Sequence, residues 1–132
     1  MAKTEQEVFD FVATHLFTQG VQAIGHNGPA GSAPICLYRG PNGTKCAVGA
    51  MITDEEYDPS MEGFSARDLV HLKVVKVNDD IKANVELLEG LQTVHDAPKN
   101  WDDEDQMKMS LRYVAQEHDL KTSILKDLSF NR

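Results

Sequence analysis

Two cysteines and a histidine–aspartate pair are the residues whose types could carry out covalent chemistry. Nine residues separate Cys36 from Cys46, and His95 is followed directly by Asp96. If a helix begins just after Cys46, its thiol lies at the positive helix end, which favours the nucleophilic thiolate. A cysteine hydrolase also needs a base and an orienting group, and His95 follows the cysteine in the required chain order. One interpretation is therefore a small cysteine hydrolase that uses Cys46, His95 and Asp96.

The same residues also fit a purely structural role. Small buried hydrophobic side chains are a common role for reduced cysteines. The spacing of the two cysteines exceeds the two to four residues of a zinc knuckle and provides only half of a site. The sequence also lacks the pair of histidines four residues apart that makes a helical metal site specific. We expect at least partly buried thiols, no bound metal and no cofactor.

Aromatic, basic and acidic residues give candidate binding positions. Tyr38, Arg39 and Asn42 surround a Gly-Pro-Asn-Gly turn, and aromatic and guanidinium groups are enriched at protein contacts. A run of acidic residues follows Trp101: Asp102, Asp103, Glu104 and Asp105. We expect Trp101, this acidic run and the turn to form the binding surface.

Length and charge restrict the class of protein. The chain has 132 residues with 13 basic and 21 acidic side chains, giving a net charge of −8. This length predicts one domain over residues 1–132. Eleven acidic and four basic residues lie between positions 78 and 120. Such a charge argues against nucleic acid or an anionic membrane as partner, and favours a protein, in particular a basic one.

No stretch reaches the eighteen or more apolar residues that a membrane helix needs, and the N-terminal region is acidic at Glu5 and Glu7. A chain with this start and only two cysteines is expected in the cytoplasm, with both thiols reduced. We therefore expect no membrane partner, while the oligomeric state stays open.

Helix signals occur near both ends of the chain. Thr4 and Glu7 form a capping box, apolar residues then recur at helical spacing, and Gly20 is a stop signal, so a helix is predicted over about 5–19. Asn78 is a second N-cap, and Pro98 ends the apolar stripe that follows it. A further helix is predicted from the acidic run to His118. The last two helices should pack as an antiparallel pair.

The region between them carries the strand signals. Residues 35–48 are predicted to form an antiparallel hairpin around Gly40–Gly43, with a third short strand as an option at residues 73–77. Residues 25–34 contain three glycines and two prolines and are predicted as a flexible loop, and residues 129–132 as a frayed tail. The expected fold class is α+β: one helix-rich domain with a hairpin packed on helices.

Four short motifs carry a resemblance. They are Cys36-Leu37-Tyr38-Arg39 with Gly43, Cys46-Ala47-Val48-Gly49, Ile52-x-Asp54-x-x-Tyr57, and Leu91-Gln92-x-Val94-His95-Asp96. With these motifs, which cover most of the chain, it resembles a group of small uncharacterised bacteriophage and bacterial proteins. The resemblance implies a phage-type accessory protein in the host cytoplasm and transfers no catalytic residue. The favoured hypothesis is a non-enzymatic protein that binds a host or phage macromolecule, first of all a protein, through the hairpin tip and the acidic helices.

Overall fold

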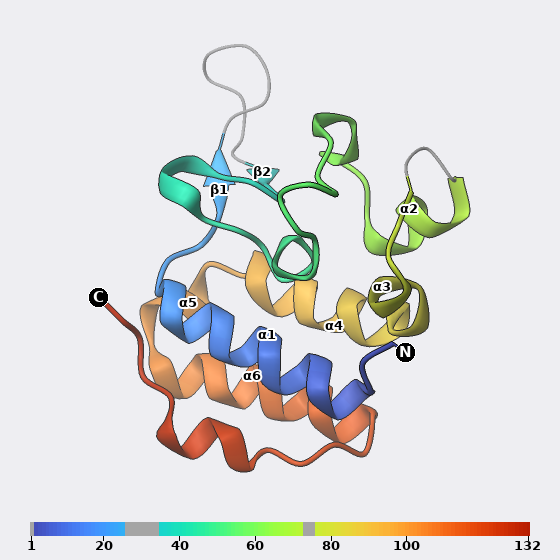
Figure 1. The fold of residues 1–132 in the computed structure, drawn as a ribbon. Helices are drawn as coiled ribbons and strands as arrows, with labels where there is room; N and C mark the ends of the chain where they lie inside the picture. Colours follow the sequence, from blue (N-terminus) through green and yellow to red (C-terminus); the bar gives the residue numbers. More distant parts are fainter. Residues whose placement is uncertain (1, 26–34, 73–75) are drawn as a thin grey trace.

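The computed structural model describes residues 2–25, 35–72 and 76–132, and it places three long helices side by side. These are α1 (Glu5–Gln19), α4 (Val85–Asp96) and α6 (Glu104–Glu117). The described residues between α1 and α3, 20–25, 35–72 and 76–78, lie over one side of this layer, as Figure 1 shows. Among the described residues, 60% are helical and 3% are in strands, so the chain is a mostly helical single domain.

Helix α1 confirms the prediction from its end signals. The Thr4 hydroxyl accepts a hydrogen bond from the backbone N–H of Glu7, while the Glu7 carboxylate accepts one from the N–H of Thr4. Gly20 ends the helix in the left-handed region, with φ of 73°. One face is fully buried in the core: Val8, Phe9, Val12, Ala13, Leu16 and Phe17.

The helical region after residue 78 contains more breaks than predicted. Asn78 caps α3 (Asp79–Ala83) by accepting a hydrogen bond from the N–H of Ile81, as expected. The chain then turns at the buried Asn84, which separates α3 from α4. A short helix, α5 (Lys99–Asp102), precedes α6, whose N-cap is Asp103. Helices α4 and α6 pack side by side in opposite directions, as predicted (Figure 1).

The predicted hairpin and the α+β class are wrong. Strand β2 (Ile35–Cys36) pairs over two residues with β1 (Ile24–Gly25), and residues 44–48 are not in a strand. The predicted turn does form: Asn42 and Gly43 have φ of 60° and 76°. Beyond it, however, the chain enters a 3-10 turn at Gly49–Met51 instead of extending a second arm.

Side chains from distant helices explain why the second arm forms no strand, although the N–H of Cys46 still donates to the carbonyl of Leu37 at 3.1 Å. The Gln19 side chain of α1 accepts a hydrogen bond from the N–H of Lys45 at 2.7 Å, and the Gln92 side chain of α4 accepts one from the N–H of Val48 at 3.1 Å. These two donors are thereby bonded to helices and not to a neighbouring strand. Strand propensity is weak enough for such tertiary contacts to override it.

The remaining elements are short. Helix α2 spans Ala66–Leu72, and further 3-10 turns occupy Pro41–Gly43, Pro59–Met61 and Ser123–Asp127. Of the third strand predicted at 73–77, residues 73–75 lie outside the described residues, and Lys76 and Val77 are not in a strand. Of the loop predicted at 25–34, residues 26–34 also lie outside the described residues, and Gly25 belongs to β1.

The C-terminal segment is docked, in contrast to the frayed tail that the sequence suggests. Phe130 stacks between Phe17 and Trp101, with ring centroids 4.9 and 5.9 Å away. The N–H of Asn131 donates to the carbonyl of Phe17 at 3.0 Å. A Cβ on Gly20 would lie 2.9 Å from the Asn131 carbonyl oxygen, so the glycine permits this close approach. The segment therefore completes the core at the C-terminal end of α1.

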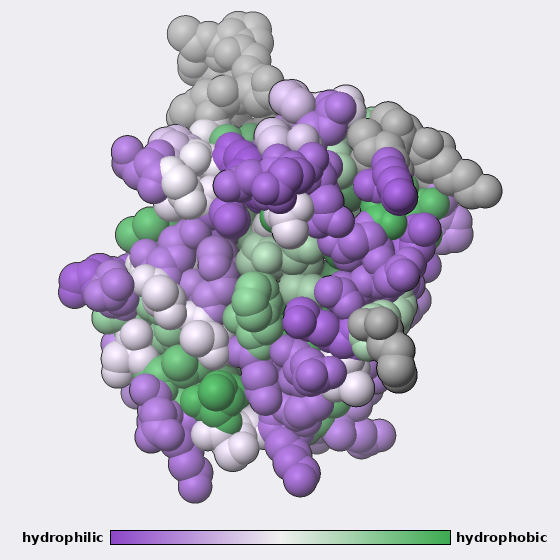
Figure 2. Space-filling view, in the orientation of Figure 1, coloured by the Kyte–Doolittle hydropathy of each residue, from purple (hydrophilic) through white to green (hydrophobic). Residues whose placement is uncertain are grey.

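The surface in Figure 2 is mainly hydrophilic, with small and separate apolar areas. No helix in the described part of the chain is long and apolar enough to span a membrane.

Candidate functional site

Helix α4 and the loop after β2 enclose a cavity of about 450 Å³. One wall consists of four side chains of α4: Glu89, Gln92, Thr93 and Asp96. Their three- and four-residue spacing brings them onto one face of the helix. The other wall consists of Cys36, Tyr38, Cys46 and residues 63–65. We call this space the Cys36 cavity.

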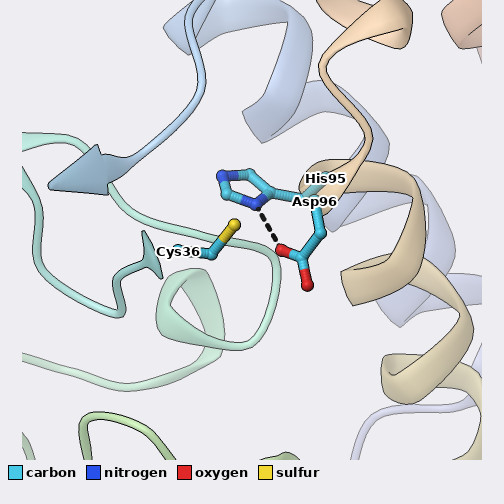
Figure 3. Close-up of side chains that lie close together, drawn as sticks. All are labelled: Cys36, His95 and Asp96. Atoms are coloured by element: carbon cyan, nitrogen blue, oxygen red, sulfur yellow. Dashed lines mark hydrogen bonds and ion pairs between the residues drawn. The ribbon is translucent and has the colours of Figure 1, made fainter. Parts of the chain in front are cut away.

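Three titratable side chains meet at one end of the Cys36 cavity. Figure 3 shows His95 and Asp96 at the end of α4, with Cys36 of β2 opposite them. The Nδ1 atom of His95 lies 3.0 Å from Oδ1 of Asp96, and the ligand atoms of all three residues lie within 4.8 Å of one another. The Cys36 sulfur lies beside the same carboxylate, whose charge acts on the thiol. The carboxylate therefore accepts from the imidazole and faces the thiol.

The protonation of His95 follows from its second partner. Its Nε2 atom lies 3.0 Å from the backbone nitrogen of Ala23, whose N–H can only donate. Nε2 is therefore an acceptor, and Nδ1 carries the ring proton that is donated to Asp96. The ring is fully buried and packs against the indole of Trp101. Both ring nitrogens are thus engaged inside the protein.

Asp96 is held in its ionised form. Burial is the largest single influence and opposes ionisation, but hydrogen bonds from His95, Cys36 and Gln92 together outweigh it. The pKa of Asp96 consequently lies below its usual value. The Gln92 amide donates to Oδ1 at 2.7 Å, so this oxygen serves two donors.

Both thiols are held in the protonated, unreactive form. Burial, followed by the hydrogen bond to Asp96 and its charge, raises the pKa of Cys36 to about 12. Burial also raises the pKa of Cys46 to about 12, although the N–H of Gly49 donates to its sulfur at 3.3 Å and acts in the opposite direction. The expected burial is confirmed, since Cys46 is buried and Cys36 is partly buried.

The group formed by Cys36, His95 and Asp96 does not fit a metal ion. A metal bound to Nδ1 of His95 would displace the proton to Nε2. The new Nε2–H would then face the N–H of Ala23 across 3.0 Å, which places two donors against each other. The tautomer that this backbone contact selects is therefore the one that cannot bind a metal at Nδ1.

The geometry also does not assemble the hydrolase that the sequence allowed. It brings Cys36, not Cys46, into the group of His95 and Asp96. The Nε2 lone pair already accepts from Ala23, and Nδ1 is protonated, so His95 has no lone pair with which to take a thiol proton. Although Cys46 precedes a turn, this is a three-residue 3-10 turn and not a long helix.

Alkylation of the native protein at pH 7.5 is expected to be at least a hundredfold slower than that of a free cysteine. The raised pKa values of about 12 leave very little thiolate, and the rate should rise with pH as both thiols ionise. Iodoacetamide labelling of each cysteine, followed by mass spectrometry, measures this. Unfolding in urea should restore rapid labelling; a fast-reacting Cys46 in the folded protein would contradict the burial argument.

Two of the predicted tip residues face inward. Tyr38 is only 5% exposed, and its hydroxyl donates to the carbonyl of Phe64. The Arg39 guanidinium donates to the carbonyls of Gly49 and Ile52 at 2.9 and 2.6 Å. Both side chains thereby hold the loop in place and offer a partner little surface. Asn42, in contrast, is exposed at the turn.

Glu62 is a residue that the sequence analysis missed. Its carboxylate accepts hydrogen bonds from the backbone N–H groups of Tyr38 and Arg39, at 2.9 and 3.2 Å, and from the Tyr57 hydroxyl at 2.7 Å. It lies in a segment without apolar periodicity, so no pattern marked it. The Tyr57 ring in turn packs under the guanidinium of Arg39, 4.9 Å from the ring centroid.

The acidic run lies at the start of α6 and lines a second cavity, of about 510 Å³. Asp102, Asp103 and Asp105 are exposed, while Glu104 accepts a hydrogen bond from the N–H of Phe130 at 3.1 Å. Phe130 and Arg132 complete the lining. We call this space the acidic cavity.

Trp101, which the sequence suggested as a contact residue, is only 5% exposed. Its Nε1–H donates to the backbone carbonyl of His95, so the indole supports His95 from inside the protein.

The motifs that carry the resemblance come together in space. Their cysteines and tyrosine, Cys36, Cys46 and Tyr38, line the Cys36 cavity opposite Gln92 and Asp96. Arg39, in the first motif, donates hydrogen bonds to the carbonyl of Gly49 in the second motif and to that of Ile52 in the third. Comparisons of the chain with protein-family models, with curated proteins and with solved structures find no match.

Proposed function

We propose that the chain is a non-enzymatic accessory protein of the phage type, which binds a basic protein partner in the host cytoplasm through the acidic cavity. One observation carries the proposal: the acidic residues 102–105 gather around a surface cavity beside an aromatic ring, Phe130. A Lys or Arg side chain of a partner would find carboxylates there. The chain's own Arg132 already lies over the Phe130 ring, 4.4 Å from its centroid, so the carboxylates and not the ring would bind the partner's cation.

The charge distribution supports the same partner class. The region 78–120 sums to −7, eleven acidic minus four basic residues, within a chain of −8. A one-signed surface of this kind raises the association rate with an oppositely charged protein. Asn42 at the exposed turn is the predicted tip residue that remains accessible for contact.

The state of the possible nucleophiles favours binding over catalysis. Each thiol has a pKa raised to about 12, and both nitrogens of His95 are engaged by Ala23 and Asp96. An activated cysteine would need a lowered pKa and an available base.

Neutralising the acidic run is expected to slow association with the partner at least tenfold in low salt. The variant carries Asp102→Asn, Asp103→Asn, Glu104→Gln and Asp105→Asn, which changes the net charge from −8 to −4. The amide introduced by Asp103→Asn can still cap α6, and the one introduced by Glu104→Gln can still accept from the N–H of Phe130. The fold should therefore be retained, with a modest loss of stability from the removed first-turn charges. Affinity capture from bacterial host lysate identifies the partner, and stopped-flow or surface-based kinetics gives the association rate at 50 and 150 mM salt.

A control variant carries the same change in charge away from the cavity: Glu55→Gln, Asp68→Asn, Asp119→Asn and Asp127→Asn. All four residues are exposed, and their side chains form no hydrogen bond with the described residues. An equal decrease of the association rate in both variants would show that net charge alone matters. The acidic cavity would then no longer be part of the proposal. Full function in the first variant together with loss in Cys46→Ala would favour the hydrolase.

A further inference from the structure

A groove of about 480 Å³ lies between α4 and α6. Each of the two helices contributes residues that are three, four and seven positions apart, so each lines the groove with one stripe of its surface. The stripes consist of Gly90, Thr93, Val94 and Ala97 on one side and Ser110, Tyr113, Val114 and Glu117 on the other. Lys99 and Asn100 of α5 complete the lining. We call this space the α4–α6 groove.

The floor of the α4–α6 groove is apolar and closed. Val94 and Val114 are only 5% and 8% exposed. A Cβ on Gly90 would lie 3.3 Å from a Cγ atom of Val114, so the glycine lets the two helices pack closely at this point. Ala97 and Ser110 add two more small side chains to the lining. The groove therefore has room for a large side chain from another molecule.

Large exposed apolar side chains stand on the same face. Tyr113 and Met109 are 65% and 62% exposed, the highest values for large apolar residues in the described part of the chain. They are four residues apart on α6 and are therefore neighbours on its surface. The next most exposed such residue, Phe11, lies on another helix, α1. This face thus combines a recess with apolar side chains that project beside it.

One cation and one anion mark the two ends of the groove. Lys99 is adjacent to Asn100, which accepts a hydrogen bond from the hydroxyl of Ser110 at 2.9 Å. Glu117 lies seven residues beyond Ser110, about two turns further along α6. Both charged side chains are exposed, and neither forms an ion pair with a described residue. The charges of the lining therefore sum to zero.

A second copy of the chain fits this face in both shape and charge. When two copies meet across a twofold axis, the same surface contacts itself, so a residue at one end faces the residue at the other end. Lys99 of each copy would face Glu117 of the other, which forms two ion pairs. Tyr113 of each copy would enter the recess of the other. A partner with charges of one sign would match only one end of the groove.

We propose that the chain forms a twofold-symmetric homodimer through the α4–α6 groove, with Tyr113 packed against the other copy and Lys99 paired with its Glu117. The ten lining residues are fewer than the roughly 20–30 per side of a standard interface, so the dimer is weak, with a Kd of about 10–100 μM. Salt at about 150 mM screens the repulsion between two chains of charge −8. The contact shares no lining residue with the acidic cavity and does not depend on its partner.

Sedimentation velocity at about 5 to 500 μM protein, a range that brackets this Kd, tests for the dimer. The mass should rise with concentration from 14.7 kDa towards twice that value. Tyr113→Ser should raise the Kd at least tenfold, because it removes the side chain that fills the groove. Phe11→Ser is the matched control on α1 and should leave the Kd unchanged. A monomer over the whole range, or equal effects of the two variants, would overturn the proposal.

Charge reversal tests the twofold pairing itself. Lys99→Glu and Glu117→Lys should each raise the Kd at least tenfold, because each places like charges at both ends of the interface. Their equimolar mixture should dimerise as well as the wild-type chain, since every pair between the two variants is again of opposite charge. The double variant should also regain wild-type dimerisation, and thermal unfolding checks that all variants are folded.

A second pair of variants controls for net charge. Lys126→Glu and Glu55→Lys change the charge from −8 to −10 and to −6, as do the reversals in the groove, but both residues are exposed outside it. Each should dimerise like the wild-type chain. The proposal is wrong if these variants and their mixture behave like the groove variants. It is also wrong if the mixture of Lys99→Glu and Glu117→Lys dimerises no better than its two components.

Discussion

Replacing His95 by alanine is expected to lower the free energy of unfolding by about 3–5 kcal/mol. The substitution leaves the N–H of Ala23 buried without its acceptor and removes a donor from the ionised Asp96. It also opens a cavity beside Trp101, whose ring centroid lies 5.6 Å from that of His95. Urea unfolding followed by circular dichroism measures the change.

Two further variants separate this effect from a general effect of losing a histidine. His71→Ala removes an exposed ring and should change stability by less than about 0.5 kcal/mol. His95→Gln can offer an acceptor near the position of Nε2 and should recover part of the loss. If His95→Ala instead kept wild-type stability and lost only a hydrolytic activity, the structural role would be refuted and the hydrolase supported.

The helices were predictable because their signals are local. The capping box of Thr4 and Glu7, the Asn78 cap and the Gly20 stop all act within one helical turn, and each is present in the structure. The break at Asn84 was not predictable in this way. It depends on the Asn84 side chain donating to the carbonyl of Lys3, which is distant in the sequence.

The hairpin prediction failed because local turn chemistry does not determine what the flanking residues pair with. The Asn-Gly turn forms as expected, with both residues at positive φ. Gln19 and Gln92, from two different helices, bind the N–H groups of Lys45 and Val48. Glutamines on helix surfaces carry no sequence signal for such a contact.

The candidate site was predicted in part. His95 and Asp96 were singled out, but the sequence assigned them to Cys46, whereas the pairing of β2 with β1 brings Cys36 to them. The backbone donor that fixes the tautomer of His95 comes from Ala23, a residue that no sequence pattern marks. The order of residues in the chain could indicate which side chains take part, but not which group binds each ring nitrogen of His95.

Arg39→Lys is expected to lower the free energy of unfolding by about 1–3 kcal/mol, although it keeps the charge. The guanidinium bonds at once to the carbonyls of Gly49 and Ile52 and lies over the ring of Tyr57. A lysine ammonium is a single point donor and cannot reproduce this planar arrangement. Thermal and urea unfolding of the variant provide the measurement.

The ion pair of Arg39 with Asp54 supplies the control, because Asp54→Asn removes the charge while leaving the carbonyl contacts. The carboxylate is 84% exposed and lies 3.2 Å from Nη2, so its loss should cost less than about 1 kcal/mol. A larger effect of Asp54→Asn than of Arg39→Lys would mean that the ion pair, and not the carbonyl contacts, holds the loop. If Arg39→Lys instead left stability unchanged and weakened partner binding, Arg39 would belong to the contact surface that the sequence first suggested.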